Sequence, residues 1–398
     1  MDSITAYTEE IDDLEEATEE LFSQIEGFKF LKNSIAILFT EEETDYPELY
    51  RILSDKWDFP IIGCTAMGMF LGKEGYCNMG ISVMILTADD CEFASGMTGE
   101  LNTDNYKAEI KGTYDGLRKT LKSEPKIIIS FGGMVTDESH AAGDDLVAAL
   151  TEAGGGIPVY GAAASDAMSF DNFRIFSNGE ITRNGQVMVL ISGNIDPKFV
   201  CVNSVENKAS FSYEITESKG NLVYRLGNGS FLDALKKADM ATDKTDVLGD
   251  YLLSPFLITM NKGENDMVEV ARNLSVLNQE NGMGSFLGVM PEGSIISIGI
   301  LNRSDVQKSV DSAFDRILKD ISDSGDKYHT LLCSSCIARF LALAGNTSAE
   351  AETYNGRLPE GVSLMGIYGY GEYCPVKGNK TGKEYNMFHN FTFTILAI

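Results

Sequence analysis

One order of elements recurs along this chain: a short apolar run, a helix, a second apolar run ending in small residues, then alternating strands. The first copy runs from "SIAILF" through a helix over 48–56 to "FPIIGC" and "ISVMILTA". The second runs from "KIIISFGG" through a helix over 139–152 to "IPVYGA" and "FRIFSNGEITRNGQVMVLIS". The third runs from "TLLCSSC" through a helix ending near residue 354 to "SLMGIYGYGE" and "HNFTFTILAI". This order predicts a mixed α/β (α+β) fold of sheets packed against helices, built from recurring strand-helix-strand-hairpin units.

The pattern changes from strand to helix in "ESKGNLVYRLGNGSFLDALKKAD", which we interpret as a domain junction. We therefore predict two domains of similar size, 28–222 and 223–398. A separate amphipathic helix is predicted over 1–27, where apolar residues recur at helical spacing among acidic ones: Ile11, Leu14, Ala17, Leu21 and Ile25.

The charge balance excludes one large class of partners. A net charge of −27 in 398 residues disfavours nucleic acids, whose phosphates require clustered Lys and Arg. The acidic N-terminus lacks the features of a signal peptide, and no apolar run approaches the length of a membrane span. Seven cysteines, an odd number, indicate reduced thiols rather than a disulfide framework. We expect a cytoplasmic protein without membrane insertion.

Two cysteines and an arginine lie close together after the start of the third unit. Cys333 and Cys336 form a CxxC pair, but no second pair exists to complete a zinc site. They are either a redox pair at a helix start or two small side chains that close a strand. Arg339 follows one turn into the helix, where it binds either a carboxylate or phosphate ligand, or an acid of the chain such as Glu350 or Glu352.

Polar residues follow the second strand of each unit. Ligands of open α/β sheets gather at the carboxyl ends of strands, so these residues are pocket candidates: Cys64, Thr65, Ser165, Asp166, Tyr370 and Glu372. Glycines are dense around the last two, which is typical of a tight turn. The alternative is that small residues at these positions only allow close packing.

The three histidines, His140, His329 and His389, are isolated in the sequence. Nothing matches a Ser-His-Asp arrangement, a metalloprotease motif or a haem-attachment motif. We expect no metal, no cofactor and no catalytic constellation.

Several stretches in order carry a resemblance to a known family. In the second half they are "SPF", "VARNL", "PEG", "CIAR", "GIYGYGEYCP" and "HNFTFTIL"; in the first half, "PIIGCTAMG" and "PVYGAAASD". The chain resembles the FIST family of bacterial and archaeal sensory proteins. It departs from the family at Gly161-Ala162, where two glycines are usual.

The resemblance implies a sensory protein with FIST N-like and FIST C-like domains that binds a small ligand, an amino acid or a related carboxylate. It also implies a separate output protein: a kinase, a cyclic-di-GMP enzyme or a chemoreceptor. A haem-binding nitric oxide sensor is the alternative that the family allows. A cysteine-dependent enzyme, with Cys64 or Cys336 as nucleophile, is a further alternative from the residues themselves.

For an amino-acid ligand we expect the strand-end loops of both halves to converge on one pocket. Arg339 is assigned to the ligand carboxylate, and Glu372 or Asp166 to its ammonium group. The remaining wall is predicted to comprise Cys64, Thr65, Ser165, Cys336, Tyr370 and Asn390.

Overall fold

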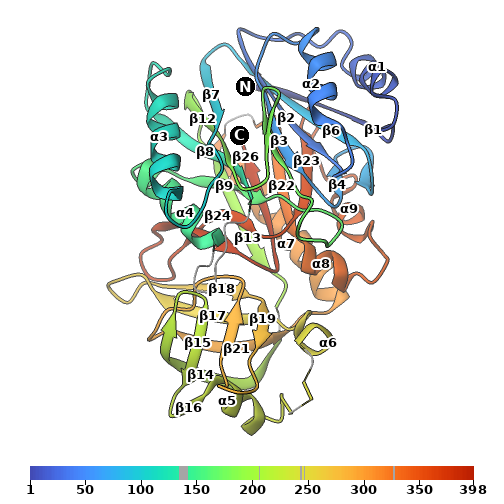
Figure 1. Cartoon of the computed structure of the whole chain (residues 1–398). Coiled ribbons are helices and arrows are strands. Elements are labelled where there is room, and N and C mark those ends of the chain that lie inside the picture. The colour runs from blue at the N-terminus through green and yellow to red at the C-terminus, as the bar shows by residue number, and fades with distance from the viewer. Residues whose placement is uncertain (134–141, 206, 243, 246, 326–327) are drawn as a thin grey trace.

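The computed structural model describes residues 1–133, 142–205, 207–242, 244–245, 247–325 and 328–398. Its described strands form four sheets, three in one body and the fourth below it (Figure 1). The mixed α/β fold predicted from the sequence is confirmed.

Sheet I contains the first unit. Its strands lie in the order β1 (Asp2–Thr8), β6 (Ile81–Ala88), β2 (Asn33–Thr40), β3 (Ile61–Thr65), β10 (Ile175–Ser177) and β11 (Glu180–Thr182). Helices α1 (Leu14–Gln24) and α2 (Tyr46–Ser54) cover its outer face. The segment predicted as one helix over 1–27 therefore begins with an edge strand, β1, whose short polar and apolar residues pair with the strongly apolar β6.

Sheet II contains the second unit in the same arrangement. Its order is β7 (Cys91–Met97), β12 (Gln186–Gly193), β8 (Pro125–Gly132), β9 (Val159–Ala163), β24 (Glu372–Lys377) and β25 (Glu384–His389). Helices α3 (Tyr106–Arg118) and α4 (Ala142–Ala153) pack on its outer face. The predicted start of α4 at residues 139–141 lies outside the described residues.

Sheet III contains the third unit. Its order is β13 (Lys198–Asn203), β26 (Thr392–Ala397), β22 (Thr330–Cys336), β23 (Ser363–Gly369), β4 (Met69–Leu71) and β5 (Gly75–Cys77). Three helices accompany it: α7 (Arg303–Ser324), α8 (Ile337–Ala342) and α9 (Ala349–Tyr354).

The three sheets share one topology. In each sheet, two neighbouring strands run parallel and are connected in the chain by one or two helices. These strand pairs are β2 with β3, β8 with β9 and β22 with β23. The hairpin of each unit pairs with a different unit: β4–β5 joins sheet III, β10–β11 joins sheet I and β24–β25 joins sheet II. The repeat predicted from the sequence is thus a threefold arrangement in which the hairpin of each unit pairs with a strand of another unit. We call these the exchanged hairpins.

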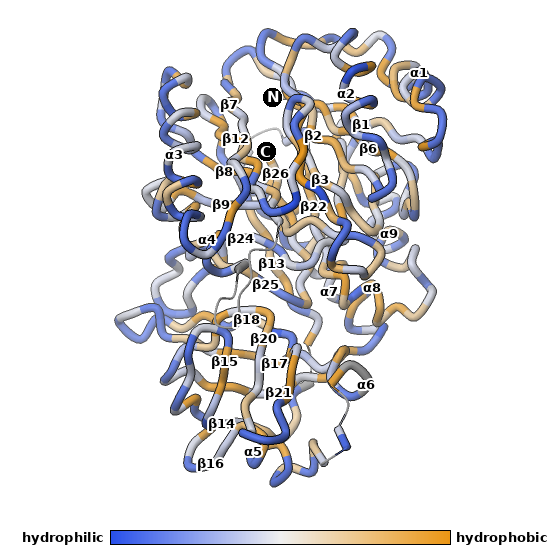
Figure 2. The backbone as a smooth tube through the Cα atoms, in the orientation of Figure 1, coloured by the Kyte–Doolittle hydropathy of each residue, from blue (hydrophilic) through white to orange (hydrophobic). Residues whose placement is uncertain are grey.

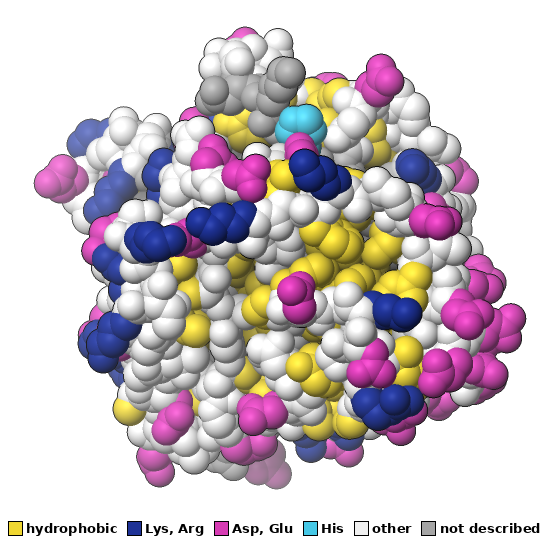
Figure 3. Space-filling view, turned by 90° about the horizontal axis from the view of Figure 1, so that it is seen from above, with side chains coloured by type: hydrophobic (Ala, Val, Ile, Leu, Met, Phe, Trp, Pro, Cys, Tyr) yellow, Lys and Arg dark blue, Asp and Glu magenta, His cyan; other side chains and the backbone are white. Residues whose placement is uncertain are grey.

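The inner faces of the three sheets make the main core. One apolar cluster draws residues from all three sheets and from α7, and hydrophobic residues concentrate on these strands (Figure 2). Seen from the end opposite sheet IV, charged side chains surround an apolar centre, with acidic ones gathered on the α1 side (Figure 3).

Sheet IV is inserted between β13 and α7. Its order is β18 (Met267–Arg272), β17 (Phe256–Asn261), β21 (Ile295–Ile300), β14 (Asn207–Lys219), β15 (Leu222–Leu226), β20 (Gly284–Phe286) and β19 (Leu274–Leu277), with β16 (Gly229–Ser230) beside β15. Helices α5 (Phe231–Lys237) and α6 (Val247–Tyr251) accompany it. The predicted domain limits stay a prediction; the boundary at 222/223 falls inside β15.

A buried ion pair ties this insertion to the three-sheet body. Arg272 of β18 is fully buried and donates to Asp144 of α4 at 2.8 Å and to the Phe388 carbonyl at 2.9 Å. Arg272 is shielded from water and Asp144 largely so, and the pair therefore constrains how the two bodies meet.

Close packing at the exchanged hairpins requires glycine. A glycine of each second strand lies opposite an aromatic residue of the incoming hairpin, in the pairs Gly63–Phe176, Gly161–Tyr373 and Gly366–Phe70. A Cβ on Gly63 would lie 1.7 Å from the Leu38 carbonyl oxygen and 2.8 Å from the Phe176 ring. Neither neighbour has room to move, because one is strand backbone and the other is a core ring.

We predict that Gly63→Ala destabilises the protein by about 1–3 kcal/mol or more, the usual cost of overpacking a core. The matched control is Gly112→Ala in the middle of α3, where a Cβ meets nothing within 4 Å. Higher helix propensity should make that variant more stable by roughly 0.5–1 kcal/mol. Urea denaturation monitored by circular dichroism measures both; equal stability of the two variants would contradict the packing described.

Candidate functional site

The predicted residues at the ends of β3 and β9 do meet, but they are occupied with one another. Thr65 Oγ1 donates to the Ser165 carbonyl at 2.9 Å, and Ser165 Oγ donates to the Tyr368 carbonyl at 2.5 Å. Both side chains are buried. These contacts join the three units at their strand ends and leave the two hydroxyls committed to the fold.

Asp166 organises the loop that follows β9. Its carboxylate accepts hydrogen bonds from Ser169 Oγ, from the backbone N–H groups of Phe170 and Asn172, and from the Tyr370 hydroxyl. Burial alone would raise the pKa of this carboxyl, but the hydrogen bonds outweigh it, Tyr370 first, and lower the pKa to about 2. Asp166 is therefore an ionised loop anchor whose oxygens are already used.

Arg339 is buried within an ion pair. Its Nη2 and Nε donate to Glu350 Oε1 at 2.5 and 3.0 Å, and both side chains are almost entirely shielded from solvent. Ser335 Oγ donates to the other carboxylate oxygen at 2.9 Å, and the guanidinium lies over the Phe393 ring. Of the two interpretations of Arg339, the structure shows the internal ion pair with Glu350.

The two thiols considered as nucleophiles are buried. Cys64 belongs to the main core, and burial raises the pKa of its thiol. Burial also raises the pKa of Cys336, and the nearby Glu372 adds to that effect. Both thiols are protonated at neutral pH, a state in which cysteine is a poor nucleophile.

Glu372 breaks the threefold pattern. The equivalent hairpin positions of the other units carry Met69 and Ile175, whereas Glu372 is a fully buried acid opposite Ala162. Its Oε2 accepts from Thr392 Oγ1 at 2.6 Å, and its Oε1 has no partner among the described residues. Burial raises the pKa of Glu372 well above its usual range.

Asn390 lies in the turn between β25 and β26, close in sequence to the Glu372 partner Thr392. It is buried, and its Oδ1 has no partner among the described residues. Buried oxygens without a hydrogen-bond partner are uncommon in folded proteins. Glu372 and Asn390 are therefore unusual polar groups inside the three-sheet body.

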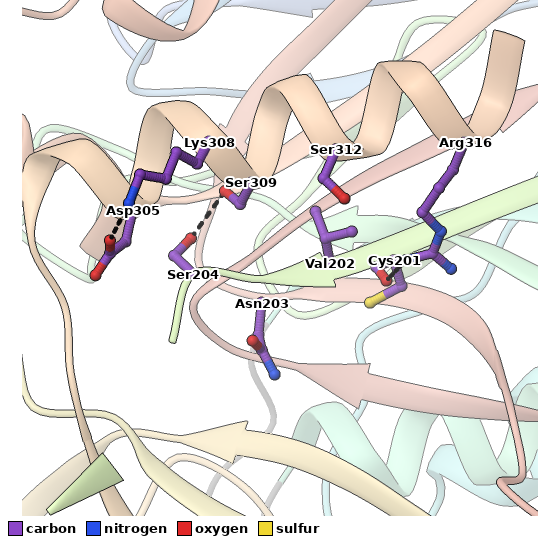
Figure 4. Close-up of a pocket in the computed structure, with 9 residues that line it drawn as sticks. All are labelled: Cys201, Val202, Asn203, Ser204, Asp305, Lys308, Ser309, Ser312 and Arg316. Carbon is purple, nitrogen blue, oxygen red and sulfur yellow. Dashed lines mark hydrogen bonds and ion pairs between the residues drawn. The ribbon is translucent and has the colours of Figure 1, made fainter. Parts of the chain in front are cut away.

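One accessible pocket lies elsewhere, between helix α7 and edge strand β13. This α7–β13 pocket has a volume of about 320 Å³ (Figure 4). Its lining comes from two segments: Cys201, Val202, Asn203 and Ser204 on one side, and Asp305, Lys308, Ser309, Ser312 and Arg316 on the other.

Two serines connect this pocket to the buried ion pair. Ser204 Oγ and Ser309 Oγ lie 3.2 Å apart across it, and Arg339 Nη1 donates to both, at 2.9 Å for Ser309. A hydroxyl that accepts from a guanidinium is polarised toward donating its own proton. Arg339 therefore positions pocket hydroxyls without lining the pocket itself.

Charged side chains of both signs belong to the α7 wall. Lys308 Nζ lies 3.5 Å from Asp305 Oδ1, and Arg316 Nη1 donates to the Cys201 carbonyl at 3.5 Å. Both distances are long for charge-assisted contacts, and in Figure 4 the Arg316 side chain reaches from α7 toward Cys201 of β13. A cation, an acid and hydroxyls in a small hollow suit a polar, charged ligand.

The nine residues predicted for the site do not line this pocket. The signal that could have found it is a polar stripe on α7, spaced four, three and four residues apart beside an apolar one: Asp305, Ser309, Ser312 and Arg316. Such a stripe on a helix that also buries Val310 and Phe314 indicates a polar cavity under the helix.

The histidines give no metal centre in the part of the chain that the structure describes. His389 is buried and its Nε2 lies 3.0 Å from the Cys374 carbonyl, while His329 is partly exposed. His140 lies outside the described residues. Within the described ranges, no three His, Cys, Asp or Glu side chains are grouped to hold a metal ion.

Most of the chain matches two known domains. The FIST N domain matches residues 34–228, and the FIST C domain matches residues 232–375. The chain belongs to the FIST family. FIST is a predicted sensory and signalling domain, so the family expected from the sequence is confirmed at that level. The described helices of this FIST protein include none that is both long and apolar enough to cross a membrane.

Individual relatives are distant. An uncharacterized protein of Methanocaldococcus jannaschii is 24% identical over 276 residues, which cover 65% of this chain and 51% of that protein. The chain thus spans about half the length of this curated relative. Among solved structures, a cyanuric acid hydrolase has a TM-score of 0.37 at 9% identity and a chorismatase 0.38 at 10%, each covering 100% of this chain and 98% of its own. Scores this low carry no argument about activity.

We predict that Arg339→Met destabilises the protein by about 3–5 kcal/mol, because Glu350 is left buried and unpaired. The double variant Arg339→Met/Glu350→Leu should recover most of that loss, since apolar side chains replace both charges. Chemical denaturation of the three proteins measures the difference. A stable Arg339→Met protein would show that the ion pair is not structural and would return Arg339 to the list of ligand contacts.

Proposed function

We propose that this FIST protein is a cytoplasmic sensory module that binds a small carboxylate ligand, preferably an amino acid, in the α7–β13 pocket. The observation that carries the proposal is the composition of that pocket: Arg316 and Lys308, the acid Asp305, and three serines around about 320 Å³. This volume falls at the small end of ligand pockets, which suits a metabolite of amino-acid size.

The carboxylate of the ligand is assigned to the Arg316 end. Its guanidinium has only the 3.5 Å contact with the Cys201 carbonyl among its described hydrogen bonds, and a carboxylate offers shorter, bidentate geometry. Ser312 on the same helix face supplies a hydroxyl donor, whereas the Ser309 hydroxyl already donates to the Val306 carbonyl at 2.6 Å.

The ammonium group of an amino acid is assigned to Asp305. Its carboxylate is buried at the start of α7, and its 3.5 Å contact with Lys308 is loose. Asp305 Oδ2 already accepts from Asn302 Nδ2, so the ammonium is assigned to Oδ1. The proposal thus retains the charge pattern predicted for an amino acid but moves it to different residues.

The proposed output is a separate protein. α7 packs on sheet III and contacts α9 and β13, so a ligand held between α7 and β13 would change how firmly this helix is fixed. A change in how firmly α7 is held is a signal that a partner protein can detect. A binding role is favoured over a cysteine-dependent reaction because burial raises the pKa of both Cys64 and Cys336.

We predict that screening the amino acids and small dicarboxylates by thermal shift yields a selective ligand. At a hundred times its dissociation constant, a ligand stabilises the native state by roughly 2.7 kcal/mol. Arg316→Gln should then weaken binding by about 1.5 kcal/mol or more, roughly tenfold in Kd by calorimetry, through loss of a charge-assisted contact.

The matched control is Lys319→Gln, which removes one positive charge from the same helix outside the pocket lining. It should leave Kd unchanged. Equal affinity of the Arg316→Gln and wild-type proteins would place the ligand elsewhere. No shift with any member of the panel would contradict the proposed ligand class.

A further inference from the structure

A groove lies between the outward faces of α3 and α4, on the side of sheet II away from the main core (Figure 1). This α3–α4 groove has a volume of about 440 Å³ and shares no lining residue with the α7–β13 pocket. Its small lining residues are Ala108 and Gly112 of α3 and Ala149 and Ala153 of α4. Small residues along two helices leave room for another helix to approach their backbones closely.

The glycines of α3 are costly for a single chain. Gly112 and Gly116 lie about one turn apart on the helix, and a Cβ on either would meet nothing within 4 Å. Glycine inside a helix costs about 0.5–1 kcal/mol relative to alanine. The packing of one chain therefore does not require glycine at either position, whereas the close approach of a second helix favours it.

The charged residues of the groove are separated by sign. α3 connects β7 to β8 and α4 connects β8 to β9, and these three strands share one direction, so both helices run the opposite way. Lys107 and Lys111 lie in the first half of α3, while Asp115 lies in its last turn and Glu152 in the last turn of α4. The groove therefore has a basic end and an acidic end.

We propose that the α3–α4 groove is the interface of a homodimer, in which α3 of a second copy lies antiparallel in the groove. A two-fold axis then places the basic end of each copy against the acidic end of the other. The alanine methyl groups and the aliphatic stems of the lysines supply the apolar contact. This inference goes beyond ligand sensing and does not depend on it, because the groove lies on a different sheet from the α7–β13 pocket.

The charges of the groove suit a second copy better than a small ion or a basic partner. Lys111 Nζ already bonds Asp115 Oδ2 at 2.9 Å, and both side chains are about half exposed, so this pair offers no enclosed charge for a small ion to neutralise. The chain carries a net charge of −27, yet the groove is lined by two lysines and two acids. This face is therefore spared the repulsion that opposes contact between other parts of two copies.

The experiment measures the mass of the full-length protein by sedimentation velocity from roughly 1 to 100 μM, the range of weak reversible dimers. The wild type should reach twice the mass of one chain. Two charge-reversed variants, Lys107→Glu/Lys111→Glu and Asp115→Lys/Glu152→Lys, should each raise the dissociation constant of the dimer by about tenfold or more, because like charges then face each other. An equimolar mixture of the two variants should dimerise, since each basic end again meets an acidic end.

Lys236→Glu/Lys237→Glu is the matched control, because it makes the same charge change on two exposed residues of α5, beside sheet IV. It should dimerise as the wild type does. Recovery on mixing also separates the interface from a folding defect, since a misfolded variant is not restored by its counterpart. A wild type that keeps the mass of one chain, a dimer that persists in both charge-reversed variants, or a mixture that stays monomeric would overturn the proposal.

Discussion

The buried pair of Arg339 and Glu350 is the interaction on which the third unit depends. A guanidinium taken out of water must find a carboxylate and hydrogen-bond acceptors, or it does not stay buried. Here the carboxylate comes from α9, and further oxygens come from Ser335 of β22, Ser204 after β13 and Ser309 of α7. One side chain thus fixes the relative positions of two strands and three helices. The wall of the α7–β13 pocket is a consequence of that arrangement.

Exchanged hairpins decide where polar groups can lie. Each hairpin pairs with a neighbouring unit, so equivalent residues of the three hairpins have similar surroundings. Most of these hairpin residues are apolar. Glu372 differs from its equivalents Met69 and Ile175, and the polar residues of the third unit gather near it. The insertion of sheet IV between β13 and α7 also occurs in this unit alone. The third unit therefore departs from the threefold pattern at Glu372 and at the inserted sheet IV.

The sequence predicted the repeat but not its connections. The strands "SIAILF", "KIIISFGG" and "TLLCSSC" were predictable because their apolar residues and the helices after them follow local rules. The exchange of hairpins was not, since pairing β24 with β9 depends on contacts about two hundred residues apart. The strand β1 was missed because its burial comes from pairing with β6 rather than from its own apolar character.

The candidate site, too, is only partly predictable from the sequence. Arg339 and Asp166 were recognised as unusual from their positions, but sequence alone could not tell a ligand contact from an internal partner. Glu350 and the loop after Asp166 supply those partners in the folded chain.

The most direct test is a crystal structure of the protein with the amino acid or carboxylate that binds it best. The account predicts ligand density between α7 and β13, with the carboxylate on Arg316 and the Arg339–Glu350 pair unchanged. Density at the ends of β3, β9 and β23, with Arg339 turned away from Glu350 toward the ligand, would contradict it.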